Sequence, residues 1–133
     1  MNIILFVEKS NGMLFNDRRV SRDKIANEQI LELCNNELYI DEFSKDMFPN
    51  ANTISQNEIS NLSSDKFYFA EQPNDIPIDK VNKFYIFNWN RDYPAEVYFD
   101  FDLNSLGFKK SIRKDFVGNS HKKITLTVFE RGI

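Results

Sequence analysis

The chain has 133 residues, of which 41% are hydrophobic, 14% aromatic and 28% charged. These proportions predict one folded domain over residues 1–133 and argue against disorder. Cys34 is the only cysteine and His121 the only histidine, which excludes a disulfide framework and any multi-histidine or cysteine-based metal site. A net charge of −3 and only four glycines argue against general nucleic-acid binding and against a glycine-rich phosphate loop.

No segment of the sequence has the pattern of an export signal or a membrane span. The first apolar run, Ile3 to Val7, is five residues long and follows no basic residue. A signal peptide has a longer apolar stretch after a basic start, and a spanning helix needs about 20 apolar residues. We therefore expect a cytoplasmic protein without membrane contact, and the free cysteine fits a reducing compartment.

The first third of the chain predicts a strand, a loop and a helix. Residues 2–8 are continuously apolar and rich in branched side chains, which is typical of a strand covered on both faces. Residues 12–23 are expected to be irregular. Ser21 as N-cap and Asp23 as an acid in the first turn predict a helix that runs to about Asn36.

The remaining elements are short, and strands dominate the second half. Expected next are a strand at 37–40, a helix at 42–48 and a capping-box helix from 55 to 62. Further strands are predicted at 66–71, 83–89, 96–101, 107–112 and 124–129. This order predicts an α/β fold, a single domain with a mixed β-sheet and flanking helices.

Two parts of the chain resemble dihydrofolate reductase. Residues 2–30 combine an apolar strand, a turn at Gly12-Met13-Leu14, a loop and an acid that opens a helix. Residues 83–131 are similar to that family's late strand and final antiparallel hairpin. The resemblance implies a reduced dihydrofolate reductase-like fold, and it puts Asp23 near the position of the family's active-site acid.

The motifs with which that family binds its cofactor are missing. Charged residues around Arg18 stand where the family has Leu-Pro-Trp, and residues 69–72 have no glycine where the family has a Gly-Gly pair. We therefore expect no cofactor and no NADPH-dependent reductase activity. A degenerate enzyme that uses Asp23 as an acid is an alternative, although an acid in a first helical turn also simply stabilises the helix dipole.

A closer resemblance is to a group of short clostridial-type proteins that are often labelled ribonuclease Z. The shared patterns are Gly12-Met13-Leu14-Phe15-Asn16-x-Arg18-Arg19-x-Ser21-x-Asp23, Trp89-Asn90-Arg91-x-Tyr93-Pro94 and Gly118-x-Ser120-His121-x-x-Ile124-Thr125. Ribonuclease Z needs a His-x-His-x-Asp-His motif to hold two zinc ions, and one histidine cannot supply it. The resemblance therefore refines the expected fold and implies no activity.

An arginine-rich loop precedes the first predicted helix. Its candidate ligand-binding residues are Asn16, Arg18, Arg19 and Arg22. Guanidinium groups beside a helix N-terminus suit a phosphate or a carboxylate. In the alternative interpretation the arginines pair with nearby acids such as Asp17 and Asp23.

A second candidate segment follows the strand at 83–89. Its candidate ligand-binding residues are Asn88, Trp89, Asn90, Arg91 and Tyr93. Trp and Tyr with Arg are typical of ligand-stacking sites and of interface hot spots. The alternative is a core tryptophan followed by a polar turn, and the exposure of Trp89 distinguishes the two.

Two further patterns carry less chemistry. Ser120 and His121 invite a hydrolase interpretation, but adjacent strand residues point to opposite faces, so we expect a structural His121 that donates to the backbone. Acids with a period of two on one strand are expected to form a solvated face rather than a cation site. These acids are Glu96, Asp100 and Asp102.

The sequence leaves three hypotheses about function. The first, a non-catalytic binding domain, holds a small anionic or nucleotide-like ligand with the arginine loop and the Trp-Asn-Arg motif. The second is a protein-binding inhibitor of the immunity type, which neutralises a toxin or another partner through an acidic and aromatic surface. The third is the degenerate enzyme that uses Asp23, which would need a raised pKa at that residue.

Overall fold

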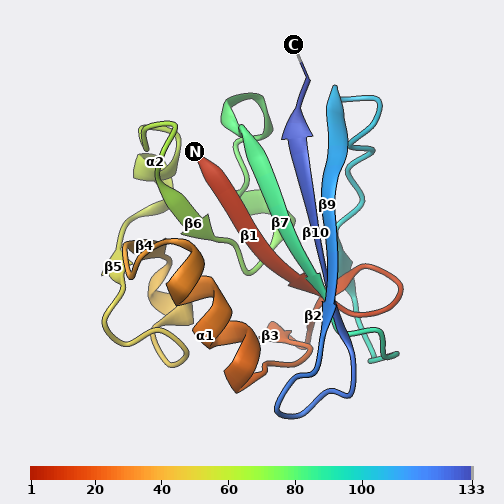
Figure 1. The fold of residues 1–133 in the computed structure, drawn as a ribbon. Helices are drawn as coiled ribbons and strands as arrows, with labels where there is room; N and C mark the ends of the chain where they lie inside the picture. The colour runs from red at the N-terminus through yellow and green to blue at the C-terminus, as the bar shows by residue number, and fades with distance from the viewer. Residues whose placement is uncertain (133) are drawn as a thin grey trace.

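The computed structural model describes residues 1–132 as one α/β domain with a mixed seven-stranded sheet and two α-helices (Figure 1). The large sheet contains β1 (Asn2–Val7), β4 (Leu38–Ile40), β5 (Asn52–Thr53), β6 (Phe67–Phe69), β7 (Lys83–Asn88), β9 (Phe108–Phe116) and β10 (Ile124–Arg131). A small sheet contains β2 (Gly12–Phe15), β3 (Arg18–Arg19) and β8 (Val97–Tyr98). The helices are α1 (Lys24–Leu33), α2 (Gln56–Ile59) and three 3-10 turns, η1 (Glu42–Ser44), η2 (Pro73–Asp75) and η3 (Ile78–Lys80). This confirms the predicted α/β class, the mixed sheet and the flanking helices.

The strands of the large sheet follow the order β5-β4-β6-β1-β7-β10-β9. The first five run parallel, and β10 and β9 form an antiparallel hairpin against β7. Because the parallel strands point the same way, the segments that leave β1, β4, β6 and β7 gather at one edge, which we call the carboxyl edge. The start of β1 and the end of β10 lie at the opposite end of the molecule (Figure 1). Ligands of open α/β sheets bind at the carboxyl ends of the strands.

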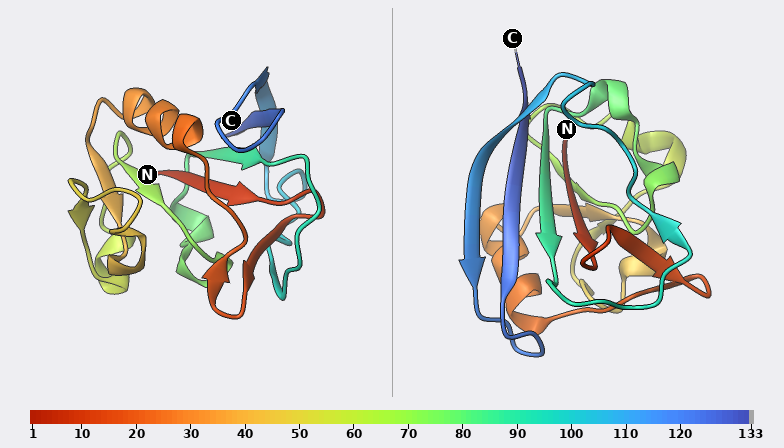
Figure 2. Two further views of the ribbon diagram at one scale, coloured as in Figure 1. Left: turned by 90° about the horizontal axis from the view of Figure 1, so that it is seen from below. Right: turned by 90° about the vertical axis from the view of Figure 1, so that its right-hand side faces the viewer.

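β1 forms the buried centre of the sheet, as its apolar sequence predicts. Successive side chains point to opposite faces. Ile4 and Phe6 pack in the core beneath α1, whereas Ile3, Leu5 and Val7 pack in a second core on the other face. Figure 2 shows α1 on one side of β1 and the β2–β3 hairpin on the other. Each fully buried side chain of this kind contributes roughly 1.5–3 kcal/mol, so two cores hold the sheet between its covering layers.

The predicted irregular stretch at 12–23 is wrong in its first part, which is the β2–β3 hairpin. Phe15 pairs with Arg18, and the two loop residues between them, Asn16 and Asp17, have φ angles of 52° and 59°. A two-residue hairpin turn of type I′ needs positive φ at both positions, and Asn and Asp tolerate it best after glycine. This turn has Asn-Asp instead of the Asn-Gly signal, and only the pairing in the fold reveals the hairpin.

α1 begins later and ends earlier than predicted. Asp23, not Ser21, is the N-cap, because its side chain accepts hydrogen bonds from the backbone N–H groups of Ile25 and Ala26. The capping box of α2 is confirmed, since the Glu58 carboxylate accepts from the N–H and hydroxyl groups of Ser55. Over residues 1–132, no helix has the length and apolar character needed to cross a membrane.

The strand predicted at 96–101 is mostly wrong, because only Val97 and Tyr98 pair in a sheet. The three acids therefore do not share a strand face. Glu96 accepts the backbone N–H of Asn16, and Asp102 accepts from Ser105 in the following turn. The strand predicted at 107–112 is longer than expected and reaches Phe116, and the helix predicted at 42–48 is only the turn η1.

Candidate functional site

Three segments singled out in the sequence meet at the carboxyl edge. They are the segment between β3 and α1, the segment after β7, and the turn between β9 and β10. Their side chains form what we call the histidine cluster, which consists of Ser21, Asp23, Trp89, Tyr93 and His121. The Nδ1 atom of His121 lies 3.0 Å from the Asp23 carboxylate. Its Nε2 atom lies 2.8 Å from the Tyr93 hydroxyl and 3.1 Å from the Ser21 hydroxyl.

The Asp23 carboxylate sits in a cradle of backbone N–H groups. Besides its two bonds to the start of α1, it accepts from the N–H groups of Asn119 and Ser120 at 2.9 and 2.7 Å. A Cβ atom at Gly118 would lie 2.5 Å from this carboxylate, so only glycine lets the turn close over it. Burial by itself raises the pKa of Asp23, but the Asn119 N–H, the His121 ring and the other N–H groups together lower it to about 2. Asp23 is therefore an ionised, fully buried carboxylate.

The ionised Asp23 determines the tautomer that we assign to His121. A carboxylate only accepts, so we place a hydrogen on Nδ1, and in this tautomer the single lone pair of Nε2 can accept from either the Tyr93 or the Ser21 hydroxyl. The indole of Trp89 stacks on the imidazole with ring centroids 4.4 Å apart. The His121 side chain is 1% exposed, so the surrounding side chains prevent the ring from rotating. The expectation that His121 donates to the backbone is thus wrong: its acceptor is a side-chain carboxylate.

A second group on the same edge, which we call the arginine cluster, consists of Arg19, Ser44, Asp46 and Glu71. The Arg19 guanidinium contacts both Glu71 oxygens and lies 2.8 Å from the Asp46 carboxylate. The Ser44 hydroxyl donates to Glu71 at 2.8 Å. Burial raises the pKa of Glu71, and the Arg19 guanidinium opposes this shift without cancelling it. Because the Arg19 guanidinium already donates hydrogen bonds to two carboxylates, it is not available to bind a ligand.

An open pocket lies between the two clusters, and we call it the arginine pocket. Its volume is about 540 Å³, and its lining residues are Arg18, Arg19, Ser21, Arg22, Glu42, Phe43 and Asp46. Arg18 is exposed, and the Arg22 side chain is 61% exposed with its guanidinium 3.5 Å from Asp46. These two arginines are the cationic groups that a ligand can reach.

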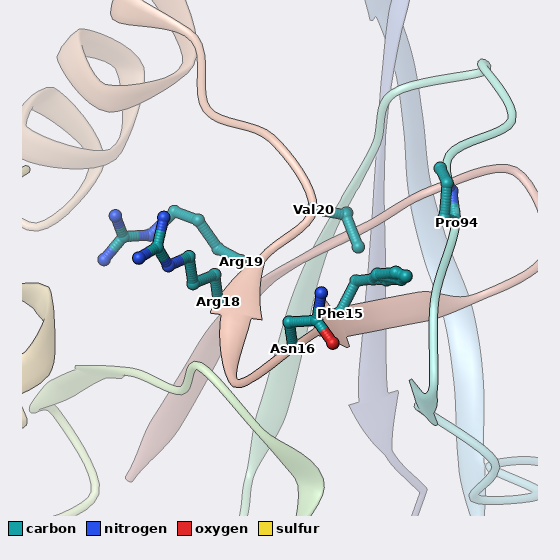
Figure 3. A pocket seen from close by; sticks show the side chains of 6 residues that line it. All are labelled: Phe15, Asn16, Arg18, Arg19, Val20 and Pro94. Atoms are coloured by element: carbon teal, nitrogen blue, oxygen red, sulfur yellow. The ribbon is translucent and has the colours of Figure 1, made fainter.

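A neighbouring pocket of about 480 Å³ lies across the β2–β3 hairpin. Its lining residues are Phe15, Asn16, Arg18, Arg19, Val20 and Pro94 (Figure 3). In this view the two arginine side chains extend from β3 away from Val20 and Pro94. Of the predicted loop residues, Arg18 and Arg22 are exposed, Asn16 forms the hairpin turn, and Arg19 is bound to Asp46, which follows η1, and to Glu71, which follows β6.

The second predicted segment mainly packs and turns. Trp89 is buried, which by the criterion set from the sequence favours a core residue over a ligand-stacking one. The Asn88 side chain accepts the N–H of Asn90, and the Asn90 amide donates to Thr125 at 2.8 Å. Arg91 is exposed, with its guanidinium 5.4 Å from the centre of the Tyr93 ring. The segment therefore contributes Trp89 and Tyr93 to the histidine cluster, and its other residues form the turn after β7.

The sequence analysis missed the partners of both clusters. It considered Ser120 beside His121, yet the Ser120 side chain is exposed, and the hydroxyl at the ring belongs to Ser21, 100 residues away. It also missed Ser44, Asp46 and Glu71. No local pattern marks these residues, and only the strand order brings Glu71 to the hairpin.

The chain matches no protein-family model and no curated protein. Within the part of the chain that the structure describes, no three His, Cys, Asp or Glu side chains are placed to hold a metal ion. The groups available at the carboxyl edge are an ionised carboxylate, an imidazole, two hydroxyls and two exposed guanidiniums.

Proposed function

We propose that the chain binds a small anion, a phosphate or a carboxylate, in the arginine pocket. The observation that carries this proposal is the pair of exposed guanidiniums, Arg18 and Arg22, on an open pocket at the carboxyl edge. Guanidinium forks match the planar arrangement of oxygen atoms in these anions. The anchored Arg19 holds β3 against η1, which limits the motion of its neighbour Arg18.

The pocket also contains carboxylates, which oppose an anion. Glu42 and Asp46 line it together with three arginines. Asp46 already accepts from Arg19, and Arg22 lies 3.5 Å away, so its charge is largely compensated. Arg18 has no ion pair among the described residues, so its charge favours a small anion over a large neutral ligand.

Titration calorimetry with inorganic phosphate tests the proposal. The Arg18→Ala/Arg22→Ala variant should bind phosphate about tenfold more weakly or worse, because each lost charged hydrogen bond costs about 1.5–3 kcal/mol. Its thermal midpoint should stay close to that of the wild type, since both side chains are exposed. Arg91→Ala is the matched control, an exposed arginine outside the pocket, and should bind normally. Equal affinity in all three proteins would refute the site.

We also infer a distant relation to dihydrofolate reductase without its cofactor site. Five parallel strands followed by an antiparallel hairpin support this inference. The gathering of the Ser21–Asp23, Trp89–Tyr93 and Ser120–His121 motifs in one cluster supports a relation to the short clostridial-type proteins. NADPH added to the protein should leave its thermal midpoint unchanged. A midpoint that rises with NADPH concentration would mean that cofactor binding persists.

A second candidate function, binding of an acidic protein partner, is favoured by the distribution of charge. Residues 108–131 contain seven Lys and Arg against two Asp and Glu, whereas the rest of the chain contains ten against eighteen. These residues form the β9–β10 hairpin, and β9 is an edge strand that is exposed from Lys109 to Asp115. An exposed edge can accept an added strand, and its lysines repel a second copy of themselves. This surface is basic, unlike the acidic surface expected of an inhibitor.

Poly-glutamate binding at low and high salt tests this second candidate. The Lys110→Glu/Arg113→Glu variant should lose binding, and Lys9→Glu/Lys24→Glu, which changes exposed lysines elsewhere, should retain it. Binding by the wild type should weaken with salt. Tight binding of an oligonucleotide instead of poly-glutamate would contradict the proposal and point to nucleic acid.

A further inference from the structure

The Ser21 hydroxyl connects the arginine pocket to the histidine cluster. Ser21 lines the pocket, and its Oγ atom lies 3.1 Å from Nε2 of His121. The opposite ring nitrogen is held by the ionised Asp23. A nucleophile, a base in hydrogen-bond reach of it and a third group that orients the base are the arrangement that activates a serine.

We propose that Ser21 is the nucleophile of an acyl-transfer site, with His121 as its base, and that the substrates are esters of small acids with a second, free carboxylate. The anionic substrate class rests on the proposed function, because Arg18 and Arg22 are the groups that would bind the free carboxylate.

Backbone structure holds all three groups. Ser21 lies between β3 and α1, Asp23 caps α1, and the carbonyl of His121 accepts the N–H of Gly118 at 2.9 Å within the β9–β10 turn. Stacking on Trp89 keeps the imidazole in one orientation. Preorganisation of this kind lets a base act without rearrangement.

The number of partners of the His121 ring distinguishes this cluster from a purely structural histidine. A buried structural histidine is satisfied by one acceptor and one donor, and Asp23 and Tyr93 already provide these. Ser21 is a third partner. It lines the arginine pocket, whereas Tyr93 does not.

The reaction follows from these positions. The Ser21 oxygen attacks the ester carbonyl carbon while Nε2 of His121 takes the hydroxyl proton. The bond between that carbon and the leaving alcohol oxygen breaks, and the alcohol takes the proton from Nε2. Water then attacks the acyl-serine, Nε2 takes one of its protons, and Ser21 recovers it as the acid leaves. No oxidant or reductant is needed.

The Tyr93 hydroxyl competes for the same acceptor. It lies closer to Nε2 than Ser21 does, at 2.8 against 3.1 Å. Removing it in Tyr93→Phe leaves the lone pair of Nε2 to Ser21 alone. The serine should then react faster, whereas a structural network would only lose stability.

Covalent labelling with a fluorophosphonate, followed by intact and peptide mass spectrometry, tests the inference. The wild type should gain one adduct on Ser21, through displacement of fluoride by the serine oxygen. Ser21→Ala and His121→Gln should lose the adduct. Ser120→Ala is the matched control, because it removes an exposed serine hydroxyl beside His121, and it should be labelled like the wild type. An unlabelled wild type, or an adduct that persists in Ser21→Ala, would overturn the inference.

Two further measurements keep this result separate from folding and from anion binding. The ring ¹⁵N shifts of His121 in the folded wild type should show hydrogen on Nδ1, and hydrogen on Nε2 instead would leave no base for Ser21. His121→Gln, whose side chain does not line the arginine pocket, should still bind phosphate in the calorimeter. Phosphate binding without labelling of the wild type would refute the nucleophile and leave the anion site intact, and labelling without phosphate binding would refute the anion site alone.

Discussion

The histidine cluster and the arginine cluster lie on the same edge of the sheet, and each buries one carboxylate. The pKa of Asp23 is lowered to about 2, whereas the pKa of Glu71 is raised by burial. Asp23 accepts from four backbone N–H groups and an imidazole. Glu71 accepts only from the side chains of Arg19 and Ser44. The hydrogen bonds to Asp23 therefore outweigh the effect of its burial on the pKa, whereas those to Glu71 do not.

The same difference separates the cluster for which we propose chemistry from the one that has a structural role. In the arginine cluster every guanidinium nitrogen of Arg19 contacts an acid or a carbonyl, so the cluster joins β3 to η1. In the histidine cluster four backbone N–H groups bind Asp23, and the Nε2 atom of His121 faces the hydroxyl groups of Tyr93 and Ser21.

The largest expected effect on stability comes from removing the Trp89 indole, which stacks on the imidazole of His121. Trp89→Ala should lower the free energy of unfolding by about 3–5 kcal/mol, because it empties a site in which the side chain is fully buried. Urea unfolding followed by circular dichroism measures this. Arg19→Ala should cost less, since its side chain is partly exposed. A small effect of Trp89→Ala would mean that the indole is a contact residue rather than part of the core.

Removal of the Asp23 carboxylate should have the second largest effect on stability. Asp23→Ala leaves buried N–H groups of α1 and of the β9–β10 turn without an acceptor, and should cost about 3 kcal/mol. Asp41→Ala is the matched control, because Asp41 caps only η1 and accepts from one N–H group. It should cost about 1 kcal/mol. Equal losses in the two variants would contradict the special role of the cradle.

The smallest expected effects are on the pH dependence of stability, to which Asp23 and Glu71 should contribute with opposite signs. Asp23 has a folded pKa below its unfolded value, so its stabilisation is complete above about pH 4 and is lost as the pH falls through about 2. Glu71 has a raised folded pKa, so its contribution is greatest below its unfolded value and is lost as the pH rises through the folded one.

Denaturant unfolding at several pH values separates the two contributions. Glu71→Gln cannot titrate, so its stability should lack the decline with rising pH that Glu71 causes in the wild type. Asp23→Asn should instead remove the decline at the acid end. The opposite result, in which Glu71→Gln flattens the acid end, would mean that Arg19 lowers the pKa of Glu71 below its ordinary value.

Local patterns were sufficient for several elements of this fold. The continuous apolar run of β1, the capping box at Ser55 and the alternation in β10 all led to elements that the structure confirms. The β2–β3 hairpin was missed because its turn residues, Asn16 and Asp17, are acceptable in many loops. The hairpin is stabilised by contacts that are distant in sequence, the pairing of β2 with β8 and the hydrogen bond from Arg19 to Glu71.

The sequence by itself determined the class of the fold, the absence of a multi-histidine metal site and the three motifs that meet at the site. These features depend on composition and on the spacing of neighbouring residues. Only the tertiary structure decided that Arg19 is anchored, that Trp89 is buried and that His121 joins Asp23 to Ser21. The hydrogen-bond partners of Arg19 and His121 are 24 to 100 residues away. The physical reason is that hydrogen bonds and burial depend on which groups the packed strands bring together, and local periodicity does not contain that information.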